Sequence, residues 1–298
     1  MFRGVFTAII TPFGKNGGID ESAFRNLIEF QLKNKIDGIV PCGTTGESPT
    51  LSDAEAKKII RLTVEAVNGR AMVIAGTGSN NTHHAIEMTK FAKEAGADGA
   101  LIVNPYYNKP TQKGLYLHFR AIADAVDIPI VVYNIKGRTA VNVETPTLVR
   151  LMNDCRNIVA VKEASGDLNQ MKDVIASRKG GFSVLSGDDN MTFSLIKEGG
   201  DGVISVASNL VPDRIVAMVH AALDGKTSEA EKLDKNLAEL FKACFIETNP
   251  IPIKTALAMK GMCHEVFRLP MCTMEDANKE KLREVLEKLR ILEAMEVS

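Results

Sequence analysis

The chain has 298 residues, of which 45% are hydrophobic, and its 36 basic residues nearly balance its 37 acidic ones. This composition excludes a disordered protein, and the balanced charge gives no electrostatic footprint for nucleic acid or an anionic membrane surface. No apolar stretch approaches the ~20 residues of a membrane-spanning helix, so we expect small molecules and further copies of the chain as partners.

Short apolar runs of β-type composition recur at regular intervals along the first two thirds of the chain. The first, residues 5–10, is too short for a signal-peptide core, and we interpret it as a strand. Segments with helical apolar spacing separate the runs, for example residues 23–32 and 54–67. The predicted strands are residues 5–10, 38–40, 72–75, 99–103, 130–133, 158–161, 182–185 and 203–206.

Strands that alternate with helices in this way predict an α/β fold, a (β/α)8 TIM barrel. The alternative, a doubly wound open sheet, would have fewer strands and a phosphate-binding glycine loop after the first. We expect residues 1–225 to form a catalytic barrel and residues 226–298 a C-terminal helical extension packed on it. The extension shows only helical periodicity, and the helical segments after the last strand are residues 215–223, 230–245, 253–259 and 278–292.

The carboxyl ends of barrel strands carry the active site, and a lysine stands at one of them. Lys162 follows the apolar run 158–161. Partial desolvation there favours the neutral amine, which attacks carbonyl carbon to form a Schiff base. The plain alternative is a solvated charge at a strand end. Tyr133 ends the neighbouring predicted strand, where its hydroxyl could move protons during imine formation.

Polar or aromatic residues also follow the second, fifth and fourth predicted strands. Residues 43–47 (GTTGE) allow backbone amides to approach a carboxylate, or form an ordinary tight turn. Arg138 can bind a carboxylate through its bidentate fork, or form a surface ion pair of little value. Tyr106 and Tyr107 lie in a loop after the fourth strand, and on local evidence these tyrosines could serve either packing or catalysis.

The last two strands and the remaining motifs complete the predicted site. Gly187 follows the seventh strand and Ile204 lies in the eighth, so we expect both to line the pocket.

Residues 76–81 lack the third glycine of a dinucleotide loop. The five histidines show no metal-ligand spacing. We therefore expect neither a metal nor an organic cofactor. Five cysteines without a Cys-x-x-Cys pair favour a reducing compartment, and we expect the cytoplasm.

Several motifs, in this order and spacing, resemble those of the dihydrodipicolinate synthase family, within the pyruvate-dependent aldolases. The resemblance implies a cofactor-free lyase that condenses pyruvate with aspartate 4-semialdehyde in the diaminopimelate route to lysine. It also implies a homotetramer built as a dimer of dimers. The motifs are residues 43–47, 106–110, 133–139, 161–164, 186–189, 202–206 and 249–254.

The resemblance assigns catalytic roles residue by residue. Lys162 resembles the family's Schiff-base lysine. Tyr133, Thr44 and Tyr107 resemble its proton relay, in which Tyr107 reaches the active site of a neighbouring subunit. An iminium is an electron sink that permits loss of a methyl proton from pyruvate near neutral pH, and hydroxyl groups can relay the protons without a histidine.

The resemblance also assigns the substrate contacts. Thr45 resembles the contact to the pyruvate carboxylate, and Arg138 the contact to the carboxylate of the aldehyde substrate. Lys136 departs from the family pattern, which has proline at this position, and leaves the conformation of this loop open.

Two other functions compete with this one. An N-acetylneuraminate lyase or a ketodeoxy-sugar acid aldolase would share the barrel, Lys162 and Tyr133, but its hydroxylated substrate calls for a neutral polar surface where Arg138 stands. A catalytically silent barrel that binds a keto acid or an amino acid would be expected to lose Lys162 or Tyr133, and both are present.

A partial match to an allosteric lysine site forms the last expectation. Relatives inhibited by lysine have a glutamate where this chain has His84, and histidines where it has Asp53 and Ala56. An imidazole cannot replace the glutamate's attraction for the ligand's ammonium, although Asp53 could supply a carboxylate from the other side. We therefore expect millimolar lysine to leave most activity intact. The residues of this possible site are Ser48, Asn80, His84 and Tyr106.

Overall fold

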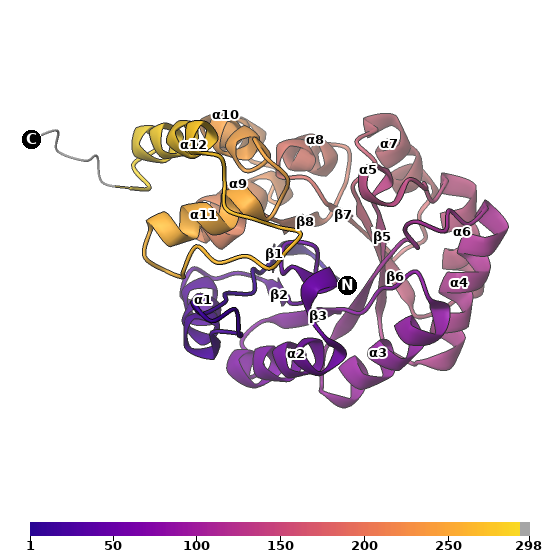
Figure 1. The fold of residues 1–298 in the computed structure, drawn as a ribbon. Coiled ribbons are helices and arrows are strands. Elements are labelled where there is room, and N and C mark those ends of the chain that lie inside the picture. The colour runs from indigo at the N-terminus through magenta and orange to yellow at the C-terminus, as the bar shows by residue number, and fades with distance from the viewer. Residues whose placement is uncertain (293–298) are drawn as a thin grey trace, which may run out of the picture.

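The computed structural model describes residues 1–292, and their strands close into a single parallel barrel in sequence order (Figure 1). Each strand pairs with its neighbours in the chain, and β1 closes the ring on β8. The predicted (β/α)8 fold is confirmed. The strands are β1 (Gly4–Ala8), β2 (Gly38–Val40), β3 (Met72–Gly76), β4 (Gly99–Val103), β5 (Ile130–Asn134), β6 (Ile158–Glu163), β7 (Ser183–Ser186) and β8 (Gly202–Ser205).

Most predicted strands are confirmed to within two residues at each end, and β6 differs in a way that matters for the site. Lys162 lies inside β6 rather than after it, opposite Tyr133 of β5 and Leu185 of β7. Backbone pairing does not depend on side-chain polarity, so the ladder continues through Lys162 and Glu163 after the apolar run has ended.

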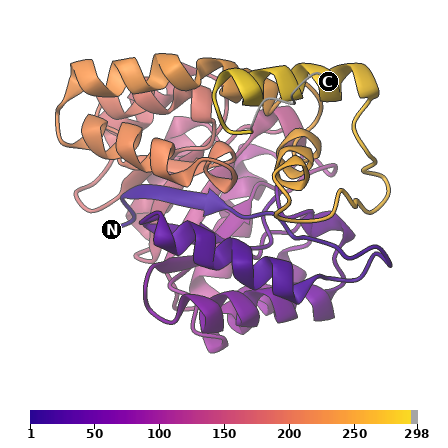
Figure 2. The same cartoon turned by 90° about the vertical axis from the view of Figure 1, so that its left-hand side faces the viewer.

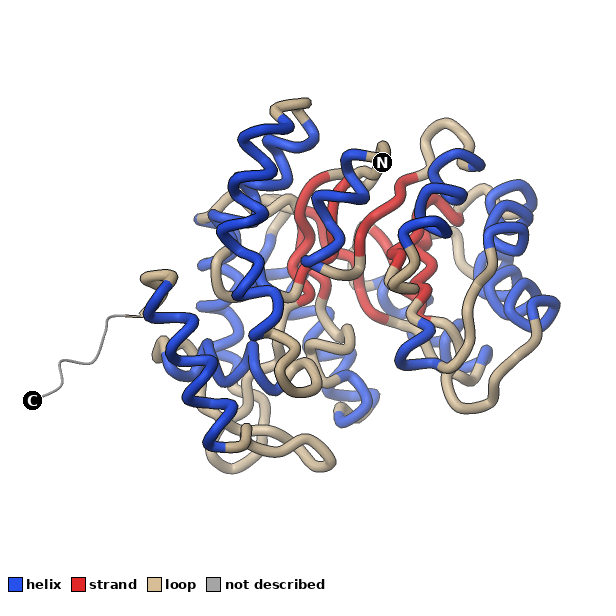
Figure 3. Tube along the Cα trace, turned by 90° about the horizontal axis from the view of Figure 1, so that it is seen from above, coloured by secondary structure: helices blue, strands red, loops and turns tan. Residues whose placement is uncertain are grey.

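Helices form the outer layer of the barrel. Figure 3 shows the strands as an inner group with helices around them. Side-chain caps mark several helix starts, and Ser52 and Glu55 form a reciprocal capping box at the start of α2. The barrel helices are α1 (Glu21–Lys33), α2 (Asp53–Val67), α3 (Thr82–Glu94), α4 (Gln112–Ala125), α5 (Lys136–Thr139), α6 (Thr145–Asp154), α7 (Leu168–Ser177), α8 (Thr192–Lys197) and α9 (Pro212–Leu223), and the 3-10 turns are η1 (Ser48–Thr50), η2 (Asp189–Met191) and η3 (Ala207–Asn209).

Alternation along the strands decides which side chains enter the barrel interior. On β6, Ala160 belongs to the interior cluster, whereas Val161 packs in the layer between strands and helices. By the same alternation Lys162 points inward and Glu163 outward. The interior cluster consists of Phe2, Phe6, Ala8, Val40, Ile74, Leu101, Val131, Tyr133, Ala160, Leu185 and Ile204.

Three helices follow the barrel and pack against its last helices. They are α10 (Thr227–Ala243), α11 (Ile251–Met259) and α12 (Asp276–Lys288). They gather beside α8 and α9, and Figure 2 shows them alongside the N-terminal elements. The predicted helix 278–292 ends early, because Arg290 adopts a left-handed backbone that a helix cannot continue. The predicted extension reached residue 298, and its last six residues lie outside the described part. No helix of residues 1–292 is long and apolar enough to cross a membrane.

Candidate active site

Lys162 lies at the centre of the candidate site. Its side chain is buried, with 5% of the residue exposed, and the Nζ atom lies 4.1 Å from the centroid of the Tyr133 ring. A cation–π contact of this kind holds an ammonium in place. Within residues 1–292 no carboxylate pairs with Lys162, so release of its proton breaks no ion pair. The sequence prediction that joined Lys162 with Tyr133 is matched by their position in the fold.

Gly187 provides the space that the lysine side chain occupies. A Cβ atom at this position would lie 3.0 Å from Cε of Lys162 and 2.7 Å from Cβ of Ala164. Any larger residue would therefore push the lysine from its present conformation. Ile204 is fully buried in the same interior cluster as Tyr133.

The loop after β2 is held by hydrogen bonds from distant parts of the chain. Thr45 is buried, and its Oγ1 accepts a hydrogen bond of 3.0 Å from Nδ2 of Asn249. Thr11 donates to the carbonyl of Gly46 at 2.7 Å. Asn249 belongs to the motif 249–254, to which the sequence alone assigned no role. Only the fold reveals its contact with Thr45.

A cavity of about 550 Å³ opens beside this loop. It is lined by Thr44 and Arg138, two of the predicted active-site residues, but Lys162 and Tyr133 are not among its lining residues. The cavity is therefore continuous with the predicted lysine-binding region rather than centred on Lys162. Three residues of the predicted lysine-binding region line the cavity: Ser48, His84 and Tyr106.

Arg138 lies on the short helix α5 after β5, where it is exposed and donates from Nη2 to the carbonyl of Asn249 at 3.0 Å. Lys136 is the first residue of α5, and its carbonyl accepts a hydrogen bond from the amide of Ala140. Proline fits the first helical position, where no amide donor is needed. Lys136 and the family's proline are thus compatible with the same turn.

Tyr107 is not brought to the other predicted catalytic residues within the chain. It is 89% exposed and has a backbone φ of 73°, a left-handed conformation that is unusual for a bulky residue. The neighbouring loop residues are ordered, because Nδ2 of Asn80 donates to the carbonyl of Tyr106 at 3.2 Å and Nδ2 of Asn108 donates to the carbonyl of Asn80 at 2.9 Å.

A buried polar network that the sequence did not predict supports β6 from outside the barrel. The carboxylate of Glu163 accepts hydrogen bonds from the amide of Ser165 at 2.7 Å, Nδ2 of Asn134 at 3.2 Å and Nε2 of Gln170 at 3.3 Å. Burial raises the pKa of Glu163, and these hydrogen bonds oppose the shift. The sequence signal that could have predicted this network is a polar residue directly after each proposed catalytic residue: Asn134 after Tyr133, and Glu163 after Lys162.

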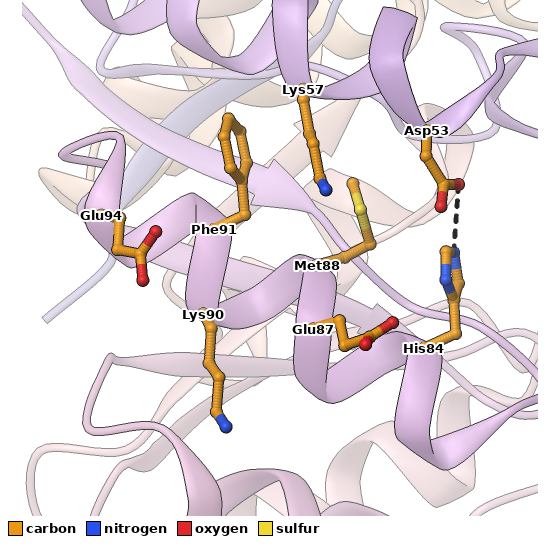
Figure 4. Close-up of a pocket in the computed structure, with 8 residues that line it drawn as sticks. All are labelled: Asp53, Lys57, His84, Glu87, Met88, Lys90, Phe91 and Glu94. Carbon is orange, nitrogen blue, oxygen red and sulfur yellow. Dashed lines mark ion pairs between the residues drawn. The ribbon is translucent and has the colours of Figure 1, made fainter.

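In the predicted lysine-binding region, a carboxylate and an imidazole from two helices lie close together. Figure 4 shows Asp53 of α2 facing His84 of α3, and the Nε2–Oδ1 distance is 3.6 Å. Both residues also line a shallow pocket of about 400 Å³. The carboxylate of Asp53 thus lies beside His84 in the predicted lysine-binding region.

Comparison with known proteins gives one consistent result. A profile of the Dihydrodipicolinate synthetase family matches residues 1–289. The 4-hydroxy-tetrahydrodipicolinate synthase of Endomicrobium trichonymphae is 53% identical over 98% of this chain and 100% of that protein. The crystal structure of dihydrodipicolinate synthase from Aquifex aeolicus has a TM-score of 0.96 at 49% identity, with 98% of this chain and 100% of that chain covered. The chloride-inhibited enzyme from Acinetobacter baumannii, complexed with pyruvate, has a TM-score of 0.96 at 41% identity, covering 98% of this chain and 100% of that chain.

Proposed function

The chain belongs to the dihydrodipicolinate synthetase family, and from this premise we propose that it condenses pyruvate with aspartate 4-semialdehyde through a Schiff base on Lys162. It is an enzyme of the 4-hydroxy-tetrahydrodipicolinate synthase type, of the diaminopimelate route to lysine. The observation that carries the proposal is the buried Lys162 amine, which lies over the Tyr133 ring and has no carboxylate partner within residues 1–292.

The reaction begins when the neutral amine of Lys162 attacks the ketone carbon of pyruvate. Water leaves the carbinolamine and an iminium forms. The iminium accepts the electron pair released when a methyl proton departs, and the resulting enamine attacks the aldehyde carbon of the second substrate. Tyr133 and Thr44 act as hydroxyl donors and acceptors for these protons. Tyr107 completes the relay from a neighbouring copy, which its exposure on the single chain supports.

Two contacts divide the substrates between separate parts of the site. Thr44 and Thr45 receive the pyruvate carboxylate, on a loop whose glycines let backbone amides approach an anion. Arg138 binds the carboxylate of the aldehyde substrate, and its position in the same cavity as Thr44 supports this role. Gly187 and Ile204 shape the wall beside Lys162. A guanidinium suits a short dicarboxylic product better than a neutral, hydroxylated sugar acid.

The proposed assembly is a homotetramer, a dimer of dimers, in the cytoplasm, with residues 1–225 as catalytic barrel and 226–298 as its extension. Exposed Tyr107 supports the assembly, because its relay role requires a second copy. The cysteines are free, which fits a reducing compartment. Sedimentation should show a homotetramer or at least a dimer, and a fully active monomer would remove Tyr107 from the relay.

We also propose that millimolar lysine leaves most activity intact. His84 stands where an attracting glutamate is found in inhibited relatives, and Asp53 already pairs with it. An initial-rate titration checks this proposal. Strong inhibition below about a millimolar, the range of ordinary metabolite sites, would overturn it and make Asp53 the substitute anion.

The decisive experiment for the function treats the protein with pyruvate and borohydride and then measures its mass. Borohydride reduces the iminium to a stable secondary amine, so we expect one reduced pyruvate per chain, located on Lys162 by peptide mapping. An unchanged mass, or an adduct on a different lysine, would contradict the mechanism. Consumption of aspartate 4-semialdehyde in the presence of pyruvate then identifies the second substrate.

A further inference from the structure

A fully buried ion pair joins the C-terminal helices to the loop after β2. The side chains of Lys254 on α11 and Glu47 are 0% and 1% exposed, and Nζ lies 2.6 Å from Oε1. The ammonium also lies 4.1 Å from the centroid of the Phe13 ring and 5.2 Å from that of Phe267. Neither charged group takes part in the proposed chemistry.

Such a pair is an inefficient source of stability. Burial lowers the pKa of Lys254, and the nearby Glu47 carboxylate opposes this shift. Well-packed apolar residues can replace a buried ion pair with little or no loss of stability. What apolar residues cannot supply is direction, because a charge-assisted hydrogen bond fixes the position of the carboxylate that accepts it. The distinctive contribution of the pair is therefore the position that it gives to Glu47.

Glu47 occupies a constrained point at the end of the predicted pyruvate-binding loop. Its backbone is left-handed, with φ of 54°, a conformation that residues other than glycine rarely adopt. The second carboxylate oxygen accepts a hydrogen bond from the amide of Arg268 at 3.3 Å, and the carbonyl of Glu47 accepts one from Thr50 at 3.0 Å. Contacts on both sides thus determine the direction in which the chain leaves Thr45.

The segment that provides Lys254 also reaches two other residues of the proposed site. Asn249 donates to the hydroxyl of Thr45 through its side chain and accepts from Arg138 through its carbonyl. Lys254 lies on the helix that follows Asn249. Of these three contacts, the one between Lys254 and Glu47 is the contact in which both side chains are charged and buried. One short stretch of the chain therefore holds the loop that receives pyruvate.

We infer that Glu47 and Lys254 are positioning residues that hold Thr44 and Thr45 in the conformation required for the pyruvate carboxylate. The C-terminal helices thereby set the pyruvate affinity of a site whose reactive lysine lies in the barrel. This inference rests on the proposed function, since it assumes that pyruvate binds at Thr44 and Thr45.

The test compares Lys254→Met and the double variant Glu47→Gln, Lys254→Met with the wild-type protein. The measured quantity is the pyruvate concentration that gives half-maximal adduct after borohydride reduction, together with the maximal adduct yield. We expect the half-saturating concentration to rise at least about tenfold in both variants. The maximal yield at saturating pyruvate stays close to one per chain, because Lys162 is unchanged.

Arg178→Met is the matched control. It removes the cation that pairs with the buried Asp201 just before β8, at the end of the barrel opposite to the site. We expect a lower melting temperature with an unchanged half-saturating concentration. If Lys254→Met fails to fold, the double variant carries the test, because it leaves no unpaired buried charge.

Two results would overturn the inference: wild-type half-saturation in the folded double variant, or an equal rise in Arg178→Met. The absence of any adduct in the wild-type protein is a different result, because it would refute the proposed function itself.

Discussion

Two buried lysines of this protein have opposite surroundings. Lys162 in the barrel lies over the Tyr133 ring and pairs with no carboxylate of residues 1–292, whereas Lys254 in the C-terminal helices pairs with Glu47 at 2.6 Å. Both ammonium groups lie within 4.1 Å of an aromatic ring centroid. The carboxylate is therefore what distinguishes the two lysines: an ion pair holds Lys254 in place, whereas Lys162, without such a partner, is the lysine that we propose reacts with pyruvate.

The largest effect is expected from exchanging the free lysine. Lys162→Met should abolish the borohydride-trapped adduct and reduce kcat/KM by more than about a thousandfold, because it removes the amine that is proposed to form the iminium. Melting should change little, since methionine preserves the apolar stem. Mass spectrometry after pyruvate and borohydride measures the adduct. Lys113→Met, at an exposed lysine of α4, serves as the control and should behave as wild type.

The paired lysine should show the reverse pattern in a stability measurement. Lys254→Met leaves the Glu47 carboxylate buried without its cation, which typically costs about 3–5 kcal/mol of unfolding free energy. Adding Glu47→Gln removes the unpaired charge, so the double variant should recover most of this loss. Urea denaturation monitored by circular dichroism measures both. A single variant as stable as the wild type would mean that the pair is not the charged contact described here.

A third variant separates the two substrates. Arg138→Ala should lower kcat/KM for aspartate 4-semialdehyde by about a hundredfold, the loss of a charge-assisted bidentate contact. The pyruvate concentration for half-maximal adduct should change far less, because the proposal assigns that substrate to Thr44 and Thr45. Steady-state kinetics and adduct titration are run on the same preparation. Comparable losses in both assays would contradict the division between substrates.

A buried base without a carboxylate extends the comparison to pH. Burial lowers the pKa of His118 to about 4 from its ordinary value of 6.5, so the folded protein keeps this imidazole neutral. The unfolded chain takes up the proton first as pH falls, and stability is lost between about pH 6.5 and pH 4. Between pH 7 and pH 5, His118 is expected to lower the free energy of unfolding by about 2 kcal/mol.

His118→Gln should remove this pH-dependent contribution. Urea denaturation at pH 7 and pH 5 provides the measurement, and His83→Gln, at a histidine whose side chain is 81% exposed, provides the control. The same fall in stability at pH 5 in wild type and His118→Gln would show that other groups cause it.

The sequence by itself determined the barrel and the adjacency of two proposed catalytic residues. Apolar runs that alternate with amphipathic segments specify buried parallel strands and covering helices through local periodicity alone. Because parallel strands of a closed barrel end on one rim, the positions of Lys162 and Tyr133 at successive strand ends were enough to predict that they would meet. The chain pattern also located Gly187 beside them.

Only the tertiary structure decided which polar groups surround the proposed site. Glu47 and Lys254 are 207 positions apart, and Thr45 and Asn249 are 204 apart. The apolar sequence of α11 indicates a buried helix, but the pairing of Lys254 with Glu47 depends on where α11 packs against the closed barrel. Periodicity determines the face that a residue occupies, whereas contacts between distant segments depend on how the whole chain closes.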